Sequence, residues 1–326
     1  MRFVLEESSW TWDGRDLDTF VARIEGLLDR LDVARERGED LSACRALFEQ
    51  KVHGVELGEI LWGANMPLEI QQRITGHFNM MRFWDDEEDF LGFEARIVDA
   101  ERFSPSAVYV HARASQDELI ACMPLPGTWS GPCTVVVADR AQIVHFVTDA
   151  ATHRGFFRSA IAEKKDEHTA EMLAGHAFPD TCFLDGVWRG VRDFDGGYRA
   201  VQKELIRFLG ILDDHGRWVL TDDTGRLTED EPEPSDLRKV GVSNDIIKNR
   251  FLAWGLDVAP EKPNVYADGV CRRARERRLG GELLYCELHY KIQLHQNRVH
   301  IHRPVKASKD RPIVAIFHEH LPLPGD

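Results

Sequence analysis

The stretch ELLYCELHYK at 282–291, followed by RVHIH at 298–302 and IVAIFHEH at 313–320, decides the fold of the C-terminal part of the chain. Polar and apolar residues alternate in all three segments, and side chains of a β-strand point alternately to the two faces of a sheet. The alternation predicts strands at 283–292, 298–303 and 312–318. We expect them to form one antiparallel sheet.

Histidines are concentrated on these strands, where six of the chain's 14 lie between positions 289 and 320. In a common sheet, imidazoles from different strands would converge beside fixed cations. Imidazole exchanges protons near neutral pH, and a cation stabilises the charge of a phosphorane. This pattern predicts acid–base cleavage of RNA without a metal or other cofactor. The candidate catalytic residues are His289, Lys291, Arg298, His300, His302 and His318.

Two other interpretations of the same residues stay open. Three histidines with Glu287 or Glu319 would also form a transition-metal site, because His-x-His is a familiar ligand spacing. The histidines could equally be residues of a half-exposed strand face without a chemical role.

A basic segment, VCRRARERRL at 270–279, precedes the strands and ends at a pair of glycines. Its composition predicts a helix, preceded by another from Ser243 to Trp254. Arginine suits bidentate contacts to phosphate. The predicted nucleic-acid-binding residues are Arg272, Arg273, Arg275, Arg277, Arg278 and Arg303. Alternatively, the arginines pair with the acidic part of the chain.

Charge is distributed unevenly along the 326 residues, which carry a net charge of −14. Residues 1–237 carry 45 Asp and Glu against 25 Lys and Arg, whereas residues 238–311 carry 8 against 16. The polar, proline-broken segment 221–237 is the best candidate for a linker. We therefore expect an acidic domain at 1–220 and a basic, histidine-rich domain at 238–326.

The acidic part mixes both periodicities. Apolar residues three and four apart predict a helical hairpin over 16–53 and helices at 152–175 and 198–212. Between 106 and 147, four segments with period two and short connectors predict an antiparallel β-meander. Together with the C-terminal helices and strands, this order of elements predicts an α+β fold.

Composition limits the classes of function. No run of about 18 apolar residues exists, which argues against a membrane span. The six cysteines are scattered without a CxxC pair, as expected of a reduced, cytoplasmic protein. The absence of a Walker loop, a GxGxxG motif and a nucleophile-elbow serine disfavours ATP hydrolysis, dinucleotide chemistry and serine hydrolysis.

The tail from Leu284 to Leu321 resembles RelE-like toxins, including the HigB type, in its order of elements and in its Asn297-Arg-Val-His sequence. The resemblance covers about a quarter of the chain and implies helices followed by an antiparallel sheet that cuts messenger RNA. This tail departs from the family in the last strand, which offers His318 and His320 and no tyrosine.

The sequence thus predicts a toxin-like or antiviral effector whose C-terminal domain binds RNA, in preference to DNA, and cleaves it. The alternative is a non-catalytic subunit of a multi-protein complex that docks a partner protein through its acidic domain.

Overall fold

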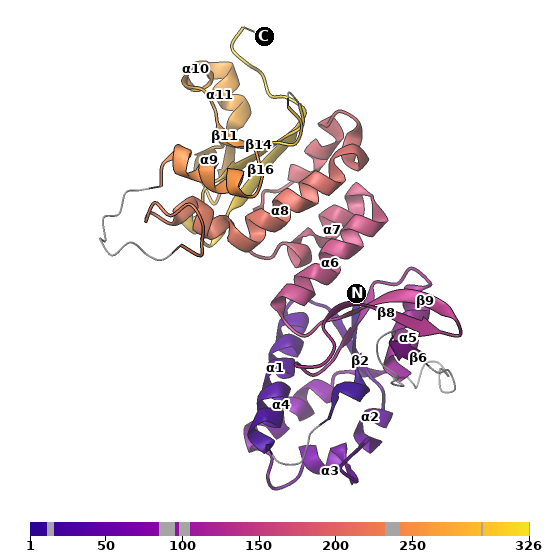
Figure 1. Ribbon diagram of the computed structural model, residues 1–326. Coiled ribbons are helices and arrows are strands. Elements are labelled where there is room, and N and C mark those ends of the chain that lie inside the picture. The colour runs from indigo at the N-terminus through magenta and orange to yellow at the C-terminus, as the bar shows by residue number, and fades with distance from the viewer. Residues whose placement is uncertain (12–15, 85–94, 98–104, 232–241, 295, 326) are drawn as a thin grey trace. The chain divides into compact units, whose positions relative to one another are not determined.

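The computed structural model describes residues 1–11, 16–84, 95–97, 105–231, 242–294 and 296–325. They form two compact units, Met1–Ala160 and Ile161–Asp326, which Figure 1 colours from indigo to magenta and from magenta to yellow. Their helices and mixed sheets confirm the α+β class. The division falls inside helix α6 (Ala150–Lys164), whereas a linker was expected at 221–237. No helix of the described segments has the length and apolar character needed to cross a membrane.

A mixed sheet with the order β5-β2-β1-β7-β9-β8-β6 forms the centre of the first unit. Neighbours from β5 to β9 pair in parallel, whereas β8 is antiparallel to β9 and β6 is antiparallel to β8. The strands are β1 (Arg2–Leu5), β2 (Asp40–Ala43), β5 (Arg82–Phe83), β6 (Ala95–Ile97), β7 (Ile120–Met123), β8 (Gly131–Val137) and β9 (Arg140–Phe146). A separate small hairpin joins β3 (Lys51–Val52) and β4 (Val55–Glu56).

Helices supply the apolar cover of this sheet. They are η1 (Glu7–Ser9), α1 (Leu17–Glu36), α2 (Ala46–Glu49), α3 (Leu57–Leu61), α4 (Leu68–Phe78), α5 (Pro105–Ala114) and α6. Strand β1 is buried on both faces. Val4 joins a core cluster in which Trp84 stacks on Tyr109 of α5, with ring centroids 4.6 Å apart. Phe3 points the other way, onto Phe156 of α6 at 5.6 Å.

Two expectations for the first unit are wrong. The hairpin predicted over 16–53 contains one long helix, α1, followed by strand β2, where Ser42 and Ala43 are buried between two parallel neighbours. The segment expected to be the first strand of a meander is helix α5. Its residues 106–111 are all buried, so it lacks the polar face that marks a surface helix. The β7 strand is parallel to both neighbours, and β8–β9 is an antiparallel hairpin.

The second unit contains the predicted C-terminal sheet, in the order β10-β16-β15-β14-β11. Strand β15 is antiparallel to both β14 and β16, as expected, β11 is antiparallel to β14, and β10 is parallel to β16. The strands are β10 (Cys182–Phe183), β11 (Val258–Pro260), β14 (Leu288–Lys291), β15 (Arg298–His302) and β16 (Ile313–His318). A second hairpin pairs β12 (Glu276–Leu279) with β13 (Glu282–Tyr285). The single strand expected at 283–292 is therefore wrong, because its first half belongs to this hairpin and its second half is β14.

The helical segments of this unit are α7 (Glu167–Ala177), η3 (Val187–Asp193), α8 (Gly197–Thr221), α9 (Asn244–Ala253), α10 (Pro263–Ala267), α11 (Gly269–Arg275) and η4 (Lys306–Ser308). The helix expected at 152–175 is two helices, α6 and α7, separated at Lys165 and Asp166. The helix expected at 198–212 continues to Thr221.

One face of the five-stranded sheet packs on α8, α9 and η3 (Figure 1). Tyr290 stacks on Phe208 of α8 with centroids 4.4 Å apart, and Phe317 contacts Trp188 of η3 at 5.3 Å. A Cβ at Gly190 would lie 2.1 Å from the carbonyl oxygen of Phe317, so η3 approaches β16 closely because this residue has no side chain. The opposite face carries the histidines.

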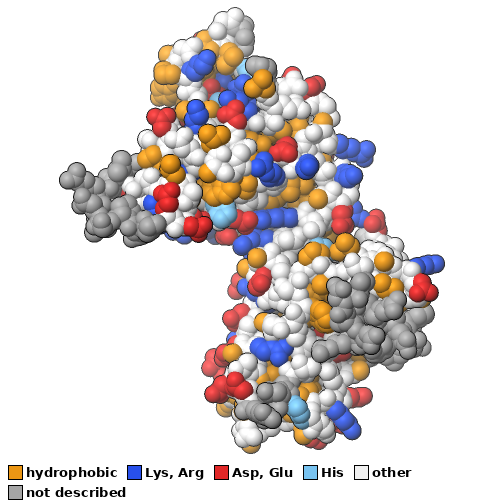
Figure 2. Space-filling model, viewed as in Figure 1, with side chains coloured by type: hydrophobic (Ala, Val, Ile, Leu, Met, Phe, Trp, Pro, Cys, Tyr) orange, Lys and Arg blue, Asp and Glu red, His pale blue; other side chains and the backbone are white. Residues whose placement is uncertain are grey.

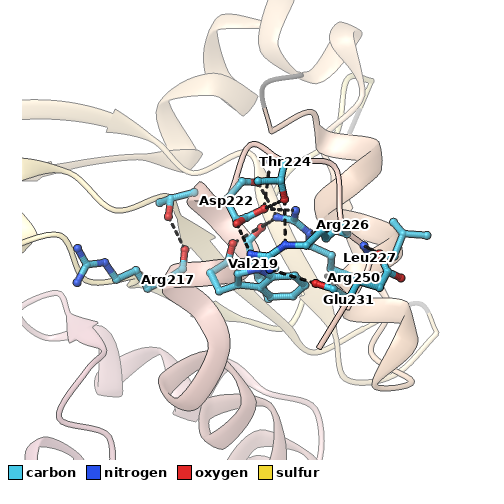
Figure 3. Close-up of polar contacts among 10 residues, drawn as sticks. Arg217, Val219, Asp222, Thr224, Arg226, Leu227, Glu231 and Arg250 are labelled. Atoms are coloured by element: carbon cyan, nitrogen blue, oxygen red, sulfur yellow. Dashed lines mark hydrogen bonds and ion pairs between the residues drawn. The ribbon is translucent and has the colours of Figure 1, made fainter. Parts of the chain in front are cut away.

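A buried arginine ties the end of α8 to α9 (Figure 3). Arg250 donates to the carbonyl oxygens of Val219 and Asp222, both at 2.9 Å, and to that of Arg226 at 2.7 Å. Its guanidinium also binds the Asp222 carboxylate at 3.1 Å and lies 4.4 Å from the Trp218 ring centroid. The acidic residues 222–231 are therefore held against this unit, and residues 232–237 of the predicted linker lie outside the described segments.

Replacing Arg250 should destabilise the second unit. We expect Arg250→Met to lower the free energy of unfolding by about 3–5 kcal/mol, because three buried or half-buried carbonyl oxygens and one carboxylate lose their donor. Hydrogen exchange of α8 and α9 measures the change. Lys248→Met, an exposed change on the same helix, is the control. Similar protection in both variants would contradict a structural role for Arg250.

Candidate functional site

Three neighbouring strands bring the predicted site residues into two rows on one face of the sheet. In the register of β14, β15 and β16, Arg298 lies between Lys291 and His318. We call Lys291, Arg298 and His318 the outer row. Two residues away on each strand, His289 of β14 lies opposite His300 of β15, and we call these two residues the inner pair. Residues two apart on a strand share a face, so the outer row and the inner pair lie side by side.

The inner pair is sealed from solvent. The rings of His289 and His300 lie 5.3 Å apart, and the residues are 4% and 0% exposed. Nδ1 of His300 lies 3.3 Å from the carbonyl oxygen of Cys286, which accepts hydrogen bonds and cannot donate them. The proton of this ring is therefore on Nδ1, and Nε2 carries the lone pair. Nε2 is buried and has no hydrogen-bond partner among the described residues.

Both imidazoles of the inner pair are neutral at physiological pH. Burial, followed by the nearby charges of Arg298 and Lys291, lowers the pKa of His289 to about 3. Burial, together with His289 and Arg275, lowers the pKa of His300 well below its ordinary value. Desolvation disfavours the imidazolium, and the adjacent cations act in the same direction. The inner pair is thus a neutral polar cluster and carries no charge to a ligand.

An ion pair covers the inner pair on the side of the sheet where β11 lies. Glu261, which follows β11, accepts from Nε of Arg275 at 2.6 Å, and its carboxylate lies 3.6 Å from Nδ1 of His289. Arg275 is completely buried and also donates to the carbonyl oxygens of Cys271 and Pro322, each at 3.0 Å. It therefore connects α11, β11 and the C-terminal segment over the histidine face.

The outer row is half-buried and presents hydrogen-bond donors. Lys291 Nζ lies 3.0 Å from Asp257, whose side chain is 49% exposed. Burial lowers the pKa of Arg298, and its Nε has no hydrogen-bond partner among the described residues. Nδ1 of His318 accepts from the backbone N–H of His320 at 3.1 Å, so in the neutral ring Nε2 carries the proton. The three side chains offer an ammonium, a guanidinium and an imidazole N–H to one place.

The last predicted catalytic residue, His302, lies away from the outer row. It is opposite Ile313, four residues along β15 from Arg298, which corresponds to about 13 Å of strand. Its Nδ1 lies 2.8 Å from the carbonyl oxygen of Arg303 and thus carries the proton. His302 and Arg298 are therefore too far apart to act on one phosphate.

The predicted arginine cluster is dispersed. Helix α11 ends at Arg275, and residues 276–279 form strand β12, so the expectation of one basic helix over 270–279 is wrong. Arg272 lies 3.3 Å from Glu276, and Arg277 donates to the carbonyl oxygens of Ala274 and Glu276. Arg303 donates to Val242 and Asn244 at the start of α9. Arg273 and Arg278 are exposed, and neither forms a side-chain hydrogen bond or ion pair with another residue that the structure describes.

A divalent metal fits the inner pair poorly. One ligand atom each from Glu261, His289 and His300 lie within 4.8 Å of one another. The Glu261 carboxylate is already neutralised by Arg275, however, and Arg298 and Lys291 add two positive charges nearby. A doubly charged cation would be repelled by all three. The converging carboxylate is Glu261, and not Glu287 or Glu319 as the metal interpretation assumed.

Sequence reasoning missed Glu261 and Asp257, because β11 has three residues and ends in proline, too short to show an alternating pattern. The single signal was a pair of carboxylates flanking that proline-containing segment. Comparisons with protein-family models, with curated proteins and with solved structures gave no match.

The lowered pKa values of the inner pair make stability depend on pH. Between about pH 3 and the ordinary histidine pKa of 6.5, the unfolded chain binds protons that the folded protein does not. The stabilisation is therefore complete above pH 6.5 and decreases as pH falls. We expect His289→Gln to reduce this slope in β14 and β15 by about 1.4 kcal/mol per pH unit.

Hydrogen exchange from pH 4.5 to 7.5 measures the slope. His168→Gln, an exposed histidine of α7, is the control and should leave the slope unchanged. A His289→Gln slope equal to that of the wild type would show that folding does not lower the pKa of His289.

Proposed function

We propose that the second unit binds RNA phosphates through the outer row and that the protein is a toxin-like effector acting on RNA. The observation that carries the proposal is the register of β14, β15 and β16, which puts Lys291, Arg298 and His318 side by side. All three offer donors, and a phosphate offers acceptors alone. The choice of RNA over DNA, and of a toxin-like role, rests on the resemblance of the tail to RelE-like toxins.

Charge supports an anionic ligand at the outer row. The ion pair between Lys291 and Asp257 is exposed on the Asp257 side, and such surface pairs contribute little, so a phosphate can replace the carboxylate. Arg298 is the central residue and is half-buried, which strengthens its interaction with an anion. A guanidinium in this setting suits bidentate binding of phosphate.

Cleavage of RNA stays a prediction, and fewer of the predicted catalytic residues are suited to proton transfer. His289 and His300 are buried and neutral, so we assign them to shaping the site and not to proton transfer. The lone pair of His318 Nδ1 is engaged by a backbone N–H, which favours a donor role for Nε2. A hydrolytic activity would therefore need a base that the bound RNA or a rearranged His318 supplies.

RNA binding should depend on Arg298. We expect Arg298→Gln to weaken binding of a fluorescein-labelled, 12-nucleotide single-stranded RNA by about ten-fold, since one charge-assisted contact is worth about 1.4 kcal/mol or more. Lys291→Gln should weaken it less. Both should lower the slope of log affinity against log salt by about 1. Fluorescence anisotropy of the full chain at several salt concentrations measures both quantities.

The matched control is Arg189→Gln, which removes an exposed arginine of η3 in the same unit. Equal affinities of wild type, Arg298→Gln and Lys291→Gln would overturn the proposal. The same samples, run on a denaturing gel with and without chelator, report cleavage. A product that His318→Asn abolishes would restore the catalytic prediction for that residue.

A further inference from the structure

The outer face of the hairpin β12–β13 carries apolar side chains beside arginine. In the antiparallel register, Leu283 lies opposite Arg278, and Tyr285 lies opposite Glu276. Residues that are directly opposite or two apart on a strand share a face of the hairpin. Leu283 and Tyr285 therefore lie on the same face as Arg278, whereas Leu284 points to the other face and is buried in the core of the unit.

Tyr266 of helix α10 extends this face. Its ring centroid lies 4.9 Å from that of Tyr285, with the ring planes 79° apart. Cζ of Arg272 lies 5.7 Å from the Tyr266 centroid, and Nε of Arg272 lies 3.3 Å from the carboxylate of Glu276. Helix and hairpin thus contribute to one surface. We call Tyr266, Arg272, Arg278, Leu283 and Tyr285 the hairpin patch.

Two apolar side chains of the hairpin patch are open to solvent. Tyr266 is 53% exposed and Leu283 is 54% exposed. Tyr285 lies between them, because it contacts Tyr266 and shares a strand face with Leu283. Figure 2 shows hydrophobic side chains next to Lys and Arg side chains over α10 and α11. Single exposed apolar residues are common on proteins, whereas a contiguous set of them marks an interaction site.

Charge on and beside the hairpin patch favours an anionic ligand. Arg278 and Arg273 are exposed, and neither forms a side-chain hydrogen bond or ion pair with another described residue. The nearby carboxylates are engaged: Glu276 pairs with Arg272, and Asp268 caps the N-terminus of α11. Two guanidinium groups are therefore available to an anion next to an exposed aromatic ring.

Single-stranded RNA has both features that this surface matches. Its phosphates accept charge-assisted hydrogen bonds from arginine, and its unpaired bases present flat faces that stack on aromatic side chains. In duplex RNA the bases stack on one another, so their faces are closed to a protein. An acidic peptide would pair with the arginines but would bring no base to the tyrosine.

We infer that the hairpin patch binds single-stranded RNA, with a base stacked on Tyr266 and the adjacent phosphates at Arg273 and Arg278. Stacking of this kind is tolerant of sequence, because every base has a π-face. The inference rests on the proposed RNA-binding function and deepens it, since it names the class of RNA and adds a contact surface made of other residues than the outer row.

Fluorescence anisotropy of the full chain tests the inference with the labelled 12-nucleotide single strand and with a labelled 12-base-pair RNA duplex. We expect Tyr266→Leu to weaken binding of the single strand about five-fold or more, because one base loses its stacking partner, and to leave duplex binding unchanged. Tyr266→Phe keeps the ring and should bind both RNAs as the wild type does. Arg278→Gln should weaken both and lower the slope of log affinity against log salt by about 1.

The matched control is Trp62→Leu, which removes an exposed aromatic ring of the first unit and should leave both affinities unchanged. Wild-type affinity of Tyr266→Leu for the single strand would overturn the inference, as would an equal loss of affinity for the duplex. Arg298→Gln in the same assay separates the two proposals. An unchanged Arg298→Gln beside a weakened Tyr266→Leu contradicts the outer row alone, and no RNA binding by the wild type contradicts both.

Discussion

The buried ion pair between Arg275 and Glu261 is the constraint on which the histidine face depends. Arg275 is fully buried, so its charge must be compensated within the protein, and the Glu261 carboxylate at 2.6 Å does this. Its remaining bonds to Cys271 and Pro322 hold helix α11 and the C-terminal segment over the sheet. Burial keeps the two imidazoles beneath the pair neutral, and the charge of Arg275 acts in the same direction.

This arrangement separates the functions of residues that look alike in sequence. Alternation on β14 and β15 puts His289, Lys291, Arg298 and His300 on one face. The cover formed by α11 then divides that face into a dry part, which contains the inner pair, and a half-buried part, which contains the outer row. Burial lowers the pKa of the imidazoles in the first part, whereas in the second part it strengthens the attraction of Arg298 for an anion.

The sequence predicted those features that depend on local pattern. Strands β15 and β16, their antiparallel pairing with β14, and helix α9 were predicted correctly, because period-two alternation and a Ser243 cap are local signals. The single strand expected at 283–292 is instead divided between β13 and β14. Features set by tertiary burial were not predictable. Helix α5 has no polar face, β2 lies between two parallel strands, and the carboxylate of the histidine cluster comes from a three-residue strand. The roles of the arginines also depend on burial, which the sequence does not show. Arg275 is buried and forms an ion pair with Glu261, whereas Arg273 is exposed.

The acidic segment after α8 is another case in which composition alone does not predict structure. Its composition is that of a linker, with carboxylates and prolines in succession. Its first ten residues are nevertheless held in place, because one arginine 24 residues beyond Arg226 takes up three of the backbone carbonyls near the α8 terminus. The charge asymmetry between residues 1–237 and 238–311 is therefore partly an internal pairing, in which Asp222 and Arg250 belong to one folded unit. A cation in the sequence therefore indicates internal structure where a carboxylate of the same unit pairs with it, as Asp222 does with Arg250.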